Sequence, residues 1–218
     1  SLYLAKHLQA ELVKTLQEFH PNGTLTDEGI WNALKLAFVR LSDRFKATGA
    51  DSGTTATVAV MLDGNLWTAN VGDSRTILQN SDKKIFQLSE DAKPDDYKYQ
   101  KGIRKRGGVV FSDGHVPRIN GILAVGRAVG DAGVGPGVSA RPKITKVSLS
   151  QISSGSHLVL ACDGIYDVAS TRQTGGLVHK LGMRVWKKNP ITIALDLVFS
   201  AYRAGSQDNL SALVVRIP

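Results

Sequence analysis

The spacing of the apolar residues changes near residue 50, and this change limits the fold more than any other feature of the sequence. Before it, large apolar residues recur every three or four positions, which is typical of amphipathic helices. They form two stripes: Leu4, Leu8, Leu12, Leu16 and Phe19, then Ile30, Leu34, Phe38, Leu41 and Phe45. Pro21 and Gly23 separate the stripes, and Thr26 is suited to cap the second helix. We therefore expect two antiparallel helices at the start of the chain.

After this point the sequence is typical of strands joined by tight turns. Asp63-Gly64 and Asp113-Gly114 each divide two β-rich runs, which is a strong signal for hairpins. Further strands are expected near residues 75–78, 144–147, 158–161 and 210–217, and helices at residues 94–106 and 190–204. Hairpins with helices grouped elsewhere predict an α+β fold in which helices cover antiparallel sheets.

The chain carries a formal net charge of +8, with basic clusters at residues 103–106 and 186–188. Such clusters are commonly solvated surface, but they can also attract an anionic partner such as a phosphoprotein. Because the sequence contains no aromatic-studded RNA motif and no zinc finger, nucleic acid is not the expected partner. No apolar run approaches the roughly 20 residues needed to span a bilayer, so no membrane span is expected.

The single cysteine, Cys162, excludes an internal disulfide framework and a cysteine-based zinc site. A reducing compartment is therefore expected, which predicts an intracellular protein of the cytoplasm or nucleus. The chain starts with Ser1 rather than methionine, and the helical stripe begins at once. With no repeat or linker in view, we expect residues 1–218 to be a single domain that is N-terminally incomplete.

Two aspartates stand beside predicted strands. Asp163 stands just after the strand at residues 158–161, at its buried end, and Asp208 precedes the strand at residues 210–217. Only the fold can bring together residues so far apart in the sequence. Carboxylates that converge at sheet ends are suited to Mg²⁺ or Mn²⁺, which prefer oxygen ligands. An aspartate at a strand end also commonly caps a turn, so both roles stay open at this point.

Two nucleophilic mechanisms can be tested against the residues around Asp163. A cysteine-nucleophile phosphatase needs an arginine six positions after its cysteine, and Val168 occupies that position. An aspartyl-phosphate mechanism of the haloacid-dehalogenase type needs a second aspartate two positions away, where Ala161 and Ile165 stand. Both mechanisms are therefore excluded, and Cys162 is expected to be a buried strand thiol.

The motifs are more informative than the spacing of single residues. A series of them resembles the motifs of one protein family, and they follow the same order along the chain. "SGTTAT" is similar to GSTA, "ANVGDSRTIL" to NVGDSRAVL, "EDAKP" to DHKP, "KRGGVV" to an AGG turn, "INGILAVGRAVGD" to VNGxLAVSRALGD, "VSARPKI" to VSAEPxV, "ACDGIYDV" to ACDGIWDV, and "SQDNLSALVV" to DNMTxIVV. These are signatures of the metal-dependent protein phosphatases of type 2C, the PPM family. The resemblance runs from Ser52 to Val215, and "YLAKHL" is similar to the helix that precedes it.

The resemblance implies a fold and a reaction. The fold is an antiparallel β-sandwich flanked by helices on both outer faces, in four layers α/β/β/α. The reaction is hydrolysis of phosphoserine or phosphothreonine on proteins by a water that bridges two Mg²⁺ or Mn²⁺ ions. Because that water is the nucleophile, no catalytic side chain is identified in this sequence. The implied partners are phosphorylated protein substrates, and we expect a monomer.

The resemblance also assigns roles to single residues. Asp163 and Asp208 match metal-ligand aspartates of the family, and Asp91 matches a position associated with a third, weaker metal near Asp163. Ala92 replaces the histidine usual beside Asp91, and a solvated loop aspartate is an alternative reading there.

Supporting roles fall on residues beside these ligands. Gly164 would let backbone and water approach the metal closely. Asp167 would support the outer site through water, and Asn209 would orient its turn by hydrogen bonding. Two further motif pairs are expected to be structural: Asp73 with Arg75, and Arg127 with Asp131.

The family's DGHGG strand, with its bridging aspartate and upstream acidic pair, is absent from this sequence. Asp113-Gly114-His115 has the letters DGH, but it falls in a hairpin turn far downstream of the expected place, so we do not assign it to the metal site. Two classes of function therefore remain: an active phosphatase, and a pseudophosphatase that keeps the fold as an interaction module. Because Asp163, Asp208 and Asn209 are all retained, the sequence favours the enzyme.

Overall fold

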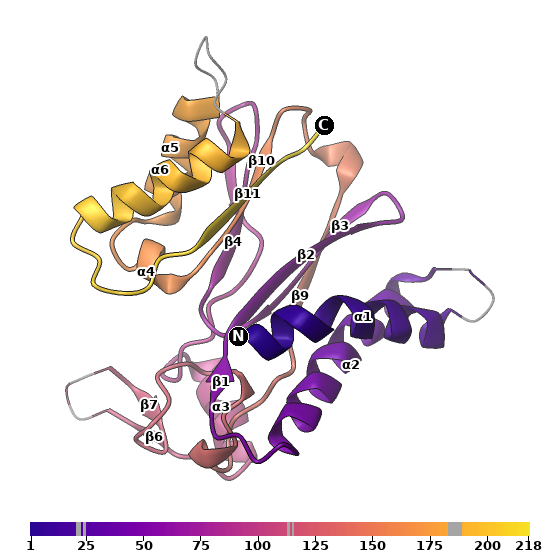
Figure 1. Ribbon diagram of the computed structural model, residues 1–218, viewed down its shortest axis with the longest axis vertical. Helices are drawn as coiled ribbons and strands as arrows, with labels where there is room; N and C mark the ends of the chain where they lie inside the picture. The colour runs from indigo at the N-terminus through magenta and orange to yellow at the C-terminus, as the bar shows by residue number, and fades with distance from the viewer. Residues whose placement is uncertain (21–22, 24, 113, 115, 183–188) are drawn as a thin grey trace. The chain divides into compact units, whose positions relative to one another are not determined.

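A computed structural model describes residues 1–20, 23, 25–112, 114, 116–182 and 189–218 (Figure 1). The chain forms two units, each described here by itself. Unit 1 contains Ser1–Ala56, Ala69–Asp73 and Asp91–Ile144, and unit 2 contains Thr57–Thr68, Ser74–Glu90 and Thr145–Pro218. The expectation of a single domain stays a prediction.

Unit 1 begins with the two expected helices, α1 (Leu2–Phe19) and α2 (Asp27–Lys46), which pack against each other. The Thr26 side chain accepts a hydrogen bond from the Gly29 N–H at 3.1 Å, so it caps α2 as the sequence predicted. Buried Glu11 of α1 forms ion pairs with Arg40 and Arg44 of α2. The capping and these ion pairs fix where α2 starts and how the two helices face each other.

The rest of unit 1 is built from short elements. They are β1 (Gly53–Thr54) paired with β8 (Val129–Gly130), α3 (Tyr97–Lys105), β6 (Val110–Phe111) paired with β7 (Arg118–Ile119), and the 3-10 turn η1 (Ala132–Val134). Their shared core contains Ala92, Tyr99, Ile103, Ile119 and Val134. Asp113 and His115 of the DGH sequence lie outside the described residues.

Unit 2 contains a four-stranded antiparallel sheet in the order β11 (Ala212–Arg216), β10 (His157–Ala161), β4 (Arg75–Gln79), β5 (Ile85–Gln87). A second sheet, most of whose residues belong to unit 2, has the order β2 (Ala56–Leu62), β3 (Asn65–Val71), β9 (Lys143–Ser148), and η2 (Leu149–Gln151) follows it. The Asp63-Gly64 turn joins β2 to β3, as predicted. Both of its residues have positive φ, which Gly and Asp tolerate.

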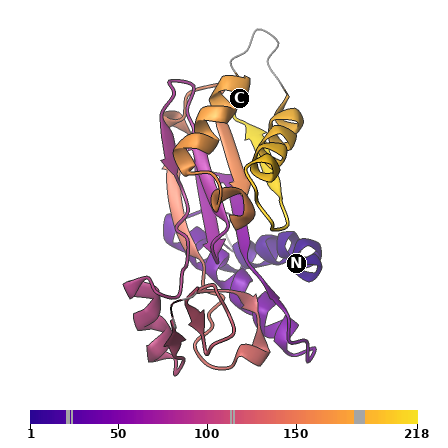
Figure 2. The same ribbon diagram turned by 90° about the vertical axis from the view of Figure 1, so that its left-hand side faces the viewer.

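Alternate residues of β10 serve the two faces of the four-stranded sheet. Leu158 and Leu160 pack with Leu66 of β3 between the two sheets. Val159 and Ala161 instead contact α5 (Thr171–Gly182) and α6 (Pro190–Arg203), which Figure 2 shows side by side in front of the strands. This alternation makes all five residues of β10 buried and layers unit 2 as helices, sheet, sheet.

The predicted α+β class with antiparallel sheets is confirmed, and α3, α6 and the long strands form where the sequence placed them. Helix α5 was not predicted, because Gly175 and Gly176 interrupt its apolar stripe. Tertiary packing explains it: a Cβ on Gly175 would lie 2.7 Å from the Ile85 side chain, so the glycine lets α5 approach β5 closely. Within the part of the chain described, no helix combines the length and apolar character required to cross a membrane.

Candidate metal centre

Asp163 lies where β10 gives way to a short helix. The strand ends at Ala161, Cys162 is the N-cap, and Asp163 is the first residue of α4 (Asp163–Tyr166). Its Oδ1 accepts a hydrogen bond from the Gly164 N–H at 3.0 Å. The side chain is half-buried rather than buried as the strand pattern suggested. Its carboxylate is therefore more accessible to ligands and pays a smaller desolvation cost.

Asp208 lies at the same end of the sheet. It belongs to the segment that enters β11, and its Oδ1 accepts from the Asn209 N–H at 2.7 Å. Strands β10 and β11 are antiparallel neighbours in which Ala161 pairs with Ala212. Asp163 follows the end of one strand and Asp208 precedes the start of the other. The pairing register therefore places the two aspartates at the same end of the sheet.

Gly164 lies close to the segment that carries Asp208. A Cβ on this residue would lie 2.9 Å from the Asn209 carbonyl oxygen and 3.1 Å from the Asp208 Cβ. The Ser206 hydroxyl donates to the Gly164 carbonyl at 2.7 Å and ties the segments further. A glycine is required here because any side chain would push the two aspartates apart.

The prediction that Cys162 is a buried strand thiol is wrong. Cys162 is half-buried, and its thiol is hydrogen-bonded rather than packed as an apolar strand residue. The Sγ lies 3.2 Å from the Asn209 carbonyl oxygen, to which it donates, and 3.2 Å from the Ser211 nitrogen, from which it accepts. The Cys162 N–H also donates to the Ser211 carbonyl at 3.2 Å. The cysteine thus holds the turn after Asp208 against the end of β10.

Asn209 acts in this turn through its backbone groups, and Asp167 ends α4. The Asp167 N–H donates to the Asp163 carbonyl at 2.7 Å, and its side chain is exposed to solvent. Arg75 of β4 lies at the same end of the sheet, opposite Ala161 in the β4–β10 register. Its guanidinium lies 4.4 Å from the centre of the Tyr166 ring and donates to the Thr171 hydroxyl at 2.9 Å. A cation therefore stands at the same strand ends as the two aspartates.

Asp91 and Asp73 belong to unit 1. Asp73 is buried and forms an ion pair with Lys93 of the "EDAKP" segment, whereas the sequence motif had paired it with Arg75. Asp91 is half-buried and precedes Ala92, whose N–H donates to the Gly72 carbonyl at 2.9 Å and whose carbonyl accepts from Gly126 at 2.6 Å. A third metal near Asp91 and Asp163 stays a prediction.

Asp131 and Arg127 also have structural contacts in unit 1. Asp131 has φ 53° and its N–H donates to the Ser52 carbonyl at 2.9 Å. Burial raises the pKa of its carboxyl, and Lys46 partly opposes that rise. Arg127 donates to the Arg141 carbonyl at 2.6 Å.

The side chains at this end of the sheet could supply part of a metal site. Within the described ranges, no group of three or more His, Cys, Asp or Glu side chains is arranged to hold a metal ion. Asp163 and Asp208 nevertheless offer two carboxylates at one sheet end, which is the ligand type that Mg²⁺ and Mn²⁺ prefer. The pair fits as part of a site for a hard cation whose other ligands would be further protein oxygens and water.

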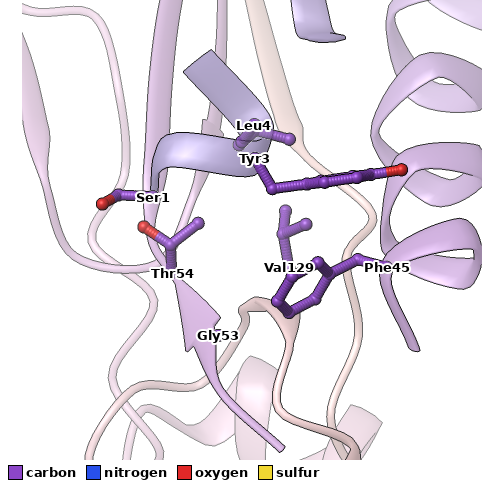
Figure 3. Close-up of a pocket in the computed structure, with 7 residues that line it drawn as sticks. All are labelled: Ser1, Tyr3, Leu4, Phe45, Gly53, Thr54 and Val129. Atoms are coloured by element: carbon purple, nitrogen blue, oxygen red, sulfur yellow. The ribbon is translucent and has the colours of Figure 1, made fainter. Parts of the chain in front are cut away.

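A cavity in unit 1 lies beside the start of α1 (Figure 3). Tyr3 extends its ring toward Phe45 of α2, with ring centres 5.1 Å apart, and Val129 lies between them in the view. The cavity has a volume of about 10 Å³, which is room for no more than about one water. It is therefore a packing gap and not a substrate pocket.

Residues 1–210 match the family model described as "Protein phosphatase 2C". The chain belongs to the protein phosphatase 2C family. This is the family that the ordered motifs resembled, and its members are metal-dependent serine/threonine protein phosphatases. The protein is therefore a member of a hydrolase family.

Relatives within the protein phosphatase 2C family cover almost the entire chain. "Probable protein phosphatase 2C 17" of Arabidopsis thaliana is 36% identical, over 98% of this chain and 72% of that protein. "Probable protein phosphatase 2C 76" of the same plant is 34% identical, over 98% of this chain and 48% of its own length. The chain thus spans only part of these relatives.

Solved structures agree on the fold. A "C.elegans sex determining protein" superposes with a TM-score of 0.83 at 26% identity, over 97% of this chain and 52% of that one. The "serine-threonine phosphatase 2C from Toxoplasma gondii" superposes with a TM-score of 0.78 over 100% of this chain and 82% of that one. At 18% identity the latter likeness concerns the fold alone.

Proposed function

We propose that the protein hydrolyses phosphoserine or phosphothreonine on protein substrates, and that Asp163 and Asp208 help to hold the metal ions required. The observation that carries this proposal is that the two aspartates stand at the same end of β10 and β11 in a protein phosphatase 2C chain. We further propose two core ions of Mg²⁺ or Mn²⁺ and a third near Asp91 and Asp163. Residence in the cytoplasm or nucleus and a monomeric state belong to the same proposal.

The residues around the aspartates have distinct tasks. Asp163 and Asp208 supply carboxylate oxygens, each oriented by the N–H of the following residue. Gly164 keeps the two segments close, and Cys162 holds the turn that carries Asp208. Asp167, exposed beside them, would contact the outer site through water. When bound, the ions supply a water whose pKa is lowered so that it can attack phosphorus directly.

The test is hydrolysis of a phosphothreonine peptide by the full-length protein, with Mn²⁺ and after chelation. Asp163→Asn and Asp208→Asn are each expected to lower kcat/KM by about 100-fold or more, because a metal ligand contributes at least as much as the groups that orient it. The control is Asp82→Asn, which removes an equal charge from an exposed aspartate paired with Lys84.

Two outcomes would contradict the proposal. Full-length protein with no metal-dependent turnover would support the pseudophosphatase, which uses the fold as an interaction module. Turnover that survives in both asparagine variants would leave the phosphatase reaction in place but remove the two aspartates from it.

A further inference from the structure

Four basic side chains of unit 1 lie near one another and are called here the basic surface: Lys35, Arg106, Arg127 and Arg141. Arg127 donates to the Arg141 carbonyl at 2.6 Å. Arg106 donates to the Gly137 carbonyl from Nε and Nη2, at 3.0 and 2.8 Å. Arg141 and Lys35 line the same groove together with Asn32. The four side chains come from α2, from the end of α3 and from two loops.

The arginines of the basic surface are close enough to repel one another. Burial lowers the pKa of Arg106, and the charges on Arg127 and Arg141 lower it further. Repulsion among fixed cations is unfavourable for the free protein, and a bound anion would relieve it. The basic surface is therefore suited to an anionic ligand.

Several other cations of unit 1 have compensating carboxylates. Arg40 pairs with Glu18 at 2.7 Å, Arg44 pairs with Glu11, and Lys93 pairs with Asp73. Among the residues that the structure describes, none of the ion pairs involves Lys35, Arg106 or Arg141. Lys35 instead lies 4.8 Å from the centre of the Trp31 ring.

Two of the four charges stand at positions where this chain differs from the family motifs that it resembles. Arg106 precedes Gly107-Gly108 in "KRGGVV", where the AGG turn has alanine. Arg141 stands in "VSARPKI", where VSAEPxV has glutamate. The second difference replaces a negative charge with a positive one. The family motifs alone therefore do not predict the basic surface, because they have alanine and glutamate at these two positions.

The groove beside Lys35 and Arg141 also has apolar walls, formed by Phe19, Leu36 and Val39. Phe19 is 40% exposed, so an apolar side chain could cover it. The groove has a volume of about 210 Å³, which is below the roughly 300 Å³ at which small-molecule pockets begin. It is better suited to one or two side chains of a peptide.

We propose that the basic surface binds an acidic segment of the phosphoprotein substrate, with an apolar side chain of that segment in the groove. This rests on the proposed function and names its substrate class: phosphoproteins that carry aspartate or glutamate beside an apolar residue. The carboxylates pair with Lys35, Arg106 and Arg141, and the apolar residue covers Phe19, Leu36 and Val39.

The first experiment measures binding without catalysis. The full-length protein is titrated into a fluorescent, unphosphorylated peptide of alternating glutamate and leucine, and into its glutamine counterpart. The glutamate peptide is expected to bind more tightly, with an affinity that falls as salt rises. The double variant Lys35→Glu/Arg141→Glu is expected to weaken binding about tenfold, since each reversal replaces an attraction by a repulsion.

The matched control is Lys6→Glu/Lys14→Glu, which makes the same charge change on two exposed lysines of α1 that do not line the groove. It should leave binding within about twofold of the natural protein. Equal binding of the two peptides, or an equal loss in the control, would overturn the proposal. So would a single-stranded oligonucleotide that displaces the glutamate peptide and binds more tightly, because nucleic acid would then be the partner.

The second experiment measures kcat/KM for phosphothreonine peptides joined by a flexible linker to the glutamate or glutamine segment. The glutamate form should be preferred, and the double variant should lose that preference while it keeps turnover of the glutamine form. Turnover without a preference for the glutamate form would contradict the proposed role of the basic surface and leave the proposed phosphatase function standing. Binding of the glutamate peptide without any turnover would support the basic surface and contradict the proposed phosphatase function.

Discussion

At the residue scale, the candidate metal centre depends on a position with no side chain. Gly164 stands between Asp163 and the Asp208–Asn209 turn, and the nearest atom to its missing Cβ is the Asn209 carbonyl oxygen. That atom belongs to the backbone and cannot rotate away as a flexible side chain would. The glycine therefore sets the separation of the two aspartates.

Gly164→Ala should lower both stability and activity. The added methyl would lie 2.9 Å from the Asn209 oxygen, so the segment must move, at a cost of about 1–3 kcal/mol. Thermal unfolding and Mn²⁺-dependent phosphopeptide hydrolysis measure the two effects. Gly176→Ala in α5 is the matched control, because a Cβ there meets nothing within 4 Å and helix propensity should favour it. If both alanine variants were equally active, the close approach at Gly164 would not matter to the site.

At the element scale, β10 organises unit 2 because it is buried on both faces and pairs with β4 and β11. Its first residue, His157, lies opposite Arg216 of β11 and against Gly182 at the end of α5. A Cβ on Gly182 would come within 2.6 Å of the His157 ring. The start of the strand thus buries an imidazole beside a cation.

His157 should make folding sensitive to mild acid. Burial lowers its pKa below 6.5, and Arg216 and His179 lower it further, so the folded state favours the neutral ring. The unfolded state then binds more protons between the folded pKa and 6.5. Stability should fall as the pH drops through this window and level off below it.

Urea unfolding at pH about 7.5 and about 5.5 measures this loss, and His157→Gln should reduce it. His7→Gln on α1 is a suitable control, since it removes a histidine that is not buried. An unchanged loss in His157→Gln would assign the pH sensitivity to other groups.

At the scale of the whole molecule, family membership and metal chemistry have to be reconciled. The protein phosphatase 2C family is metal-dependent, but residues 1–218 offer Asp163 and Asp208 as a pair, and within the described ranges no third carboxylate, cysteine or histidine completes a group. Two carboxylates bind a hard cation weakly, because affinity rises with the number and charge of the oxygen ligands.

The polypeptide of residues 1–218 should therefore bind Mn²⁺ only weakly, with a Kd of about 1 mM. Isothermal titration calorimetry checks this directly, and Asp163→Asn/Asp208→Asn should remove the remaining heat. Tight binding of two ions would mean that other groups of this polypeptide complete the site.

Much of the fold was predictable because its signals are local. The three-to-four-residue stripes predicted α1 and α2, and Asp63-Gly64 predicted the turn between β2 and β3. Helix α5 could not be predicted, since Gly175 is favourable only where Ile85 packs against it. Cys162 was read as apolar packing, because no local pattern shows that Asn209 and Ser211 bond its thiol.

By itself, the sequence determined the α+β class, the family and the identity of the aspartates, because periodicity, turn residues and motifs lie within short stretches. Only the tertiary structure decided which of these residues meet. Asp163 comes to the same sheet end as Asp208 through the β10–β11 register, and Arg106, Arg127 and Arg141 come near one another through the packing of unit 1. These residues are far apart in the chain. They come near one another only when the hydrophobic core packs and the register of the strands is fixed.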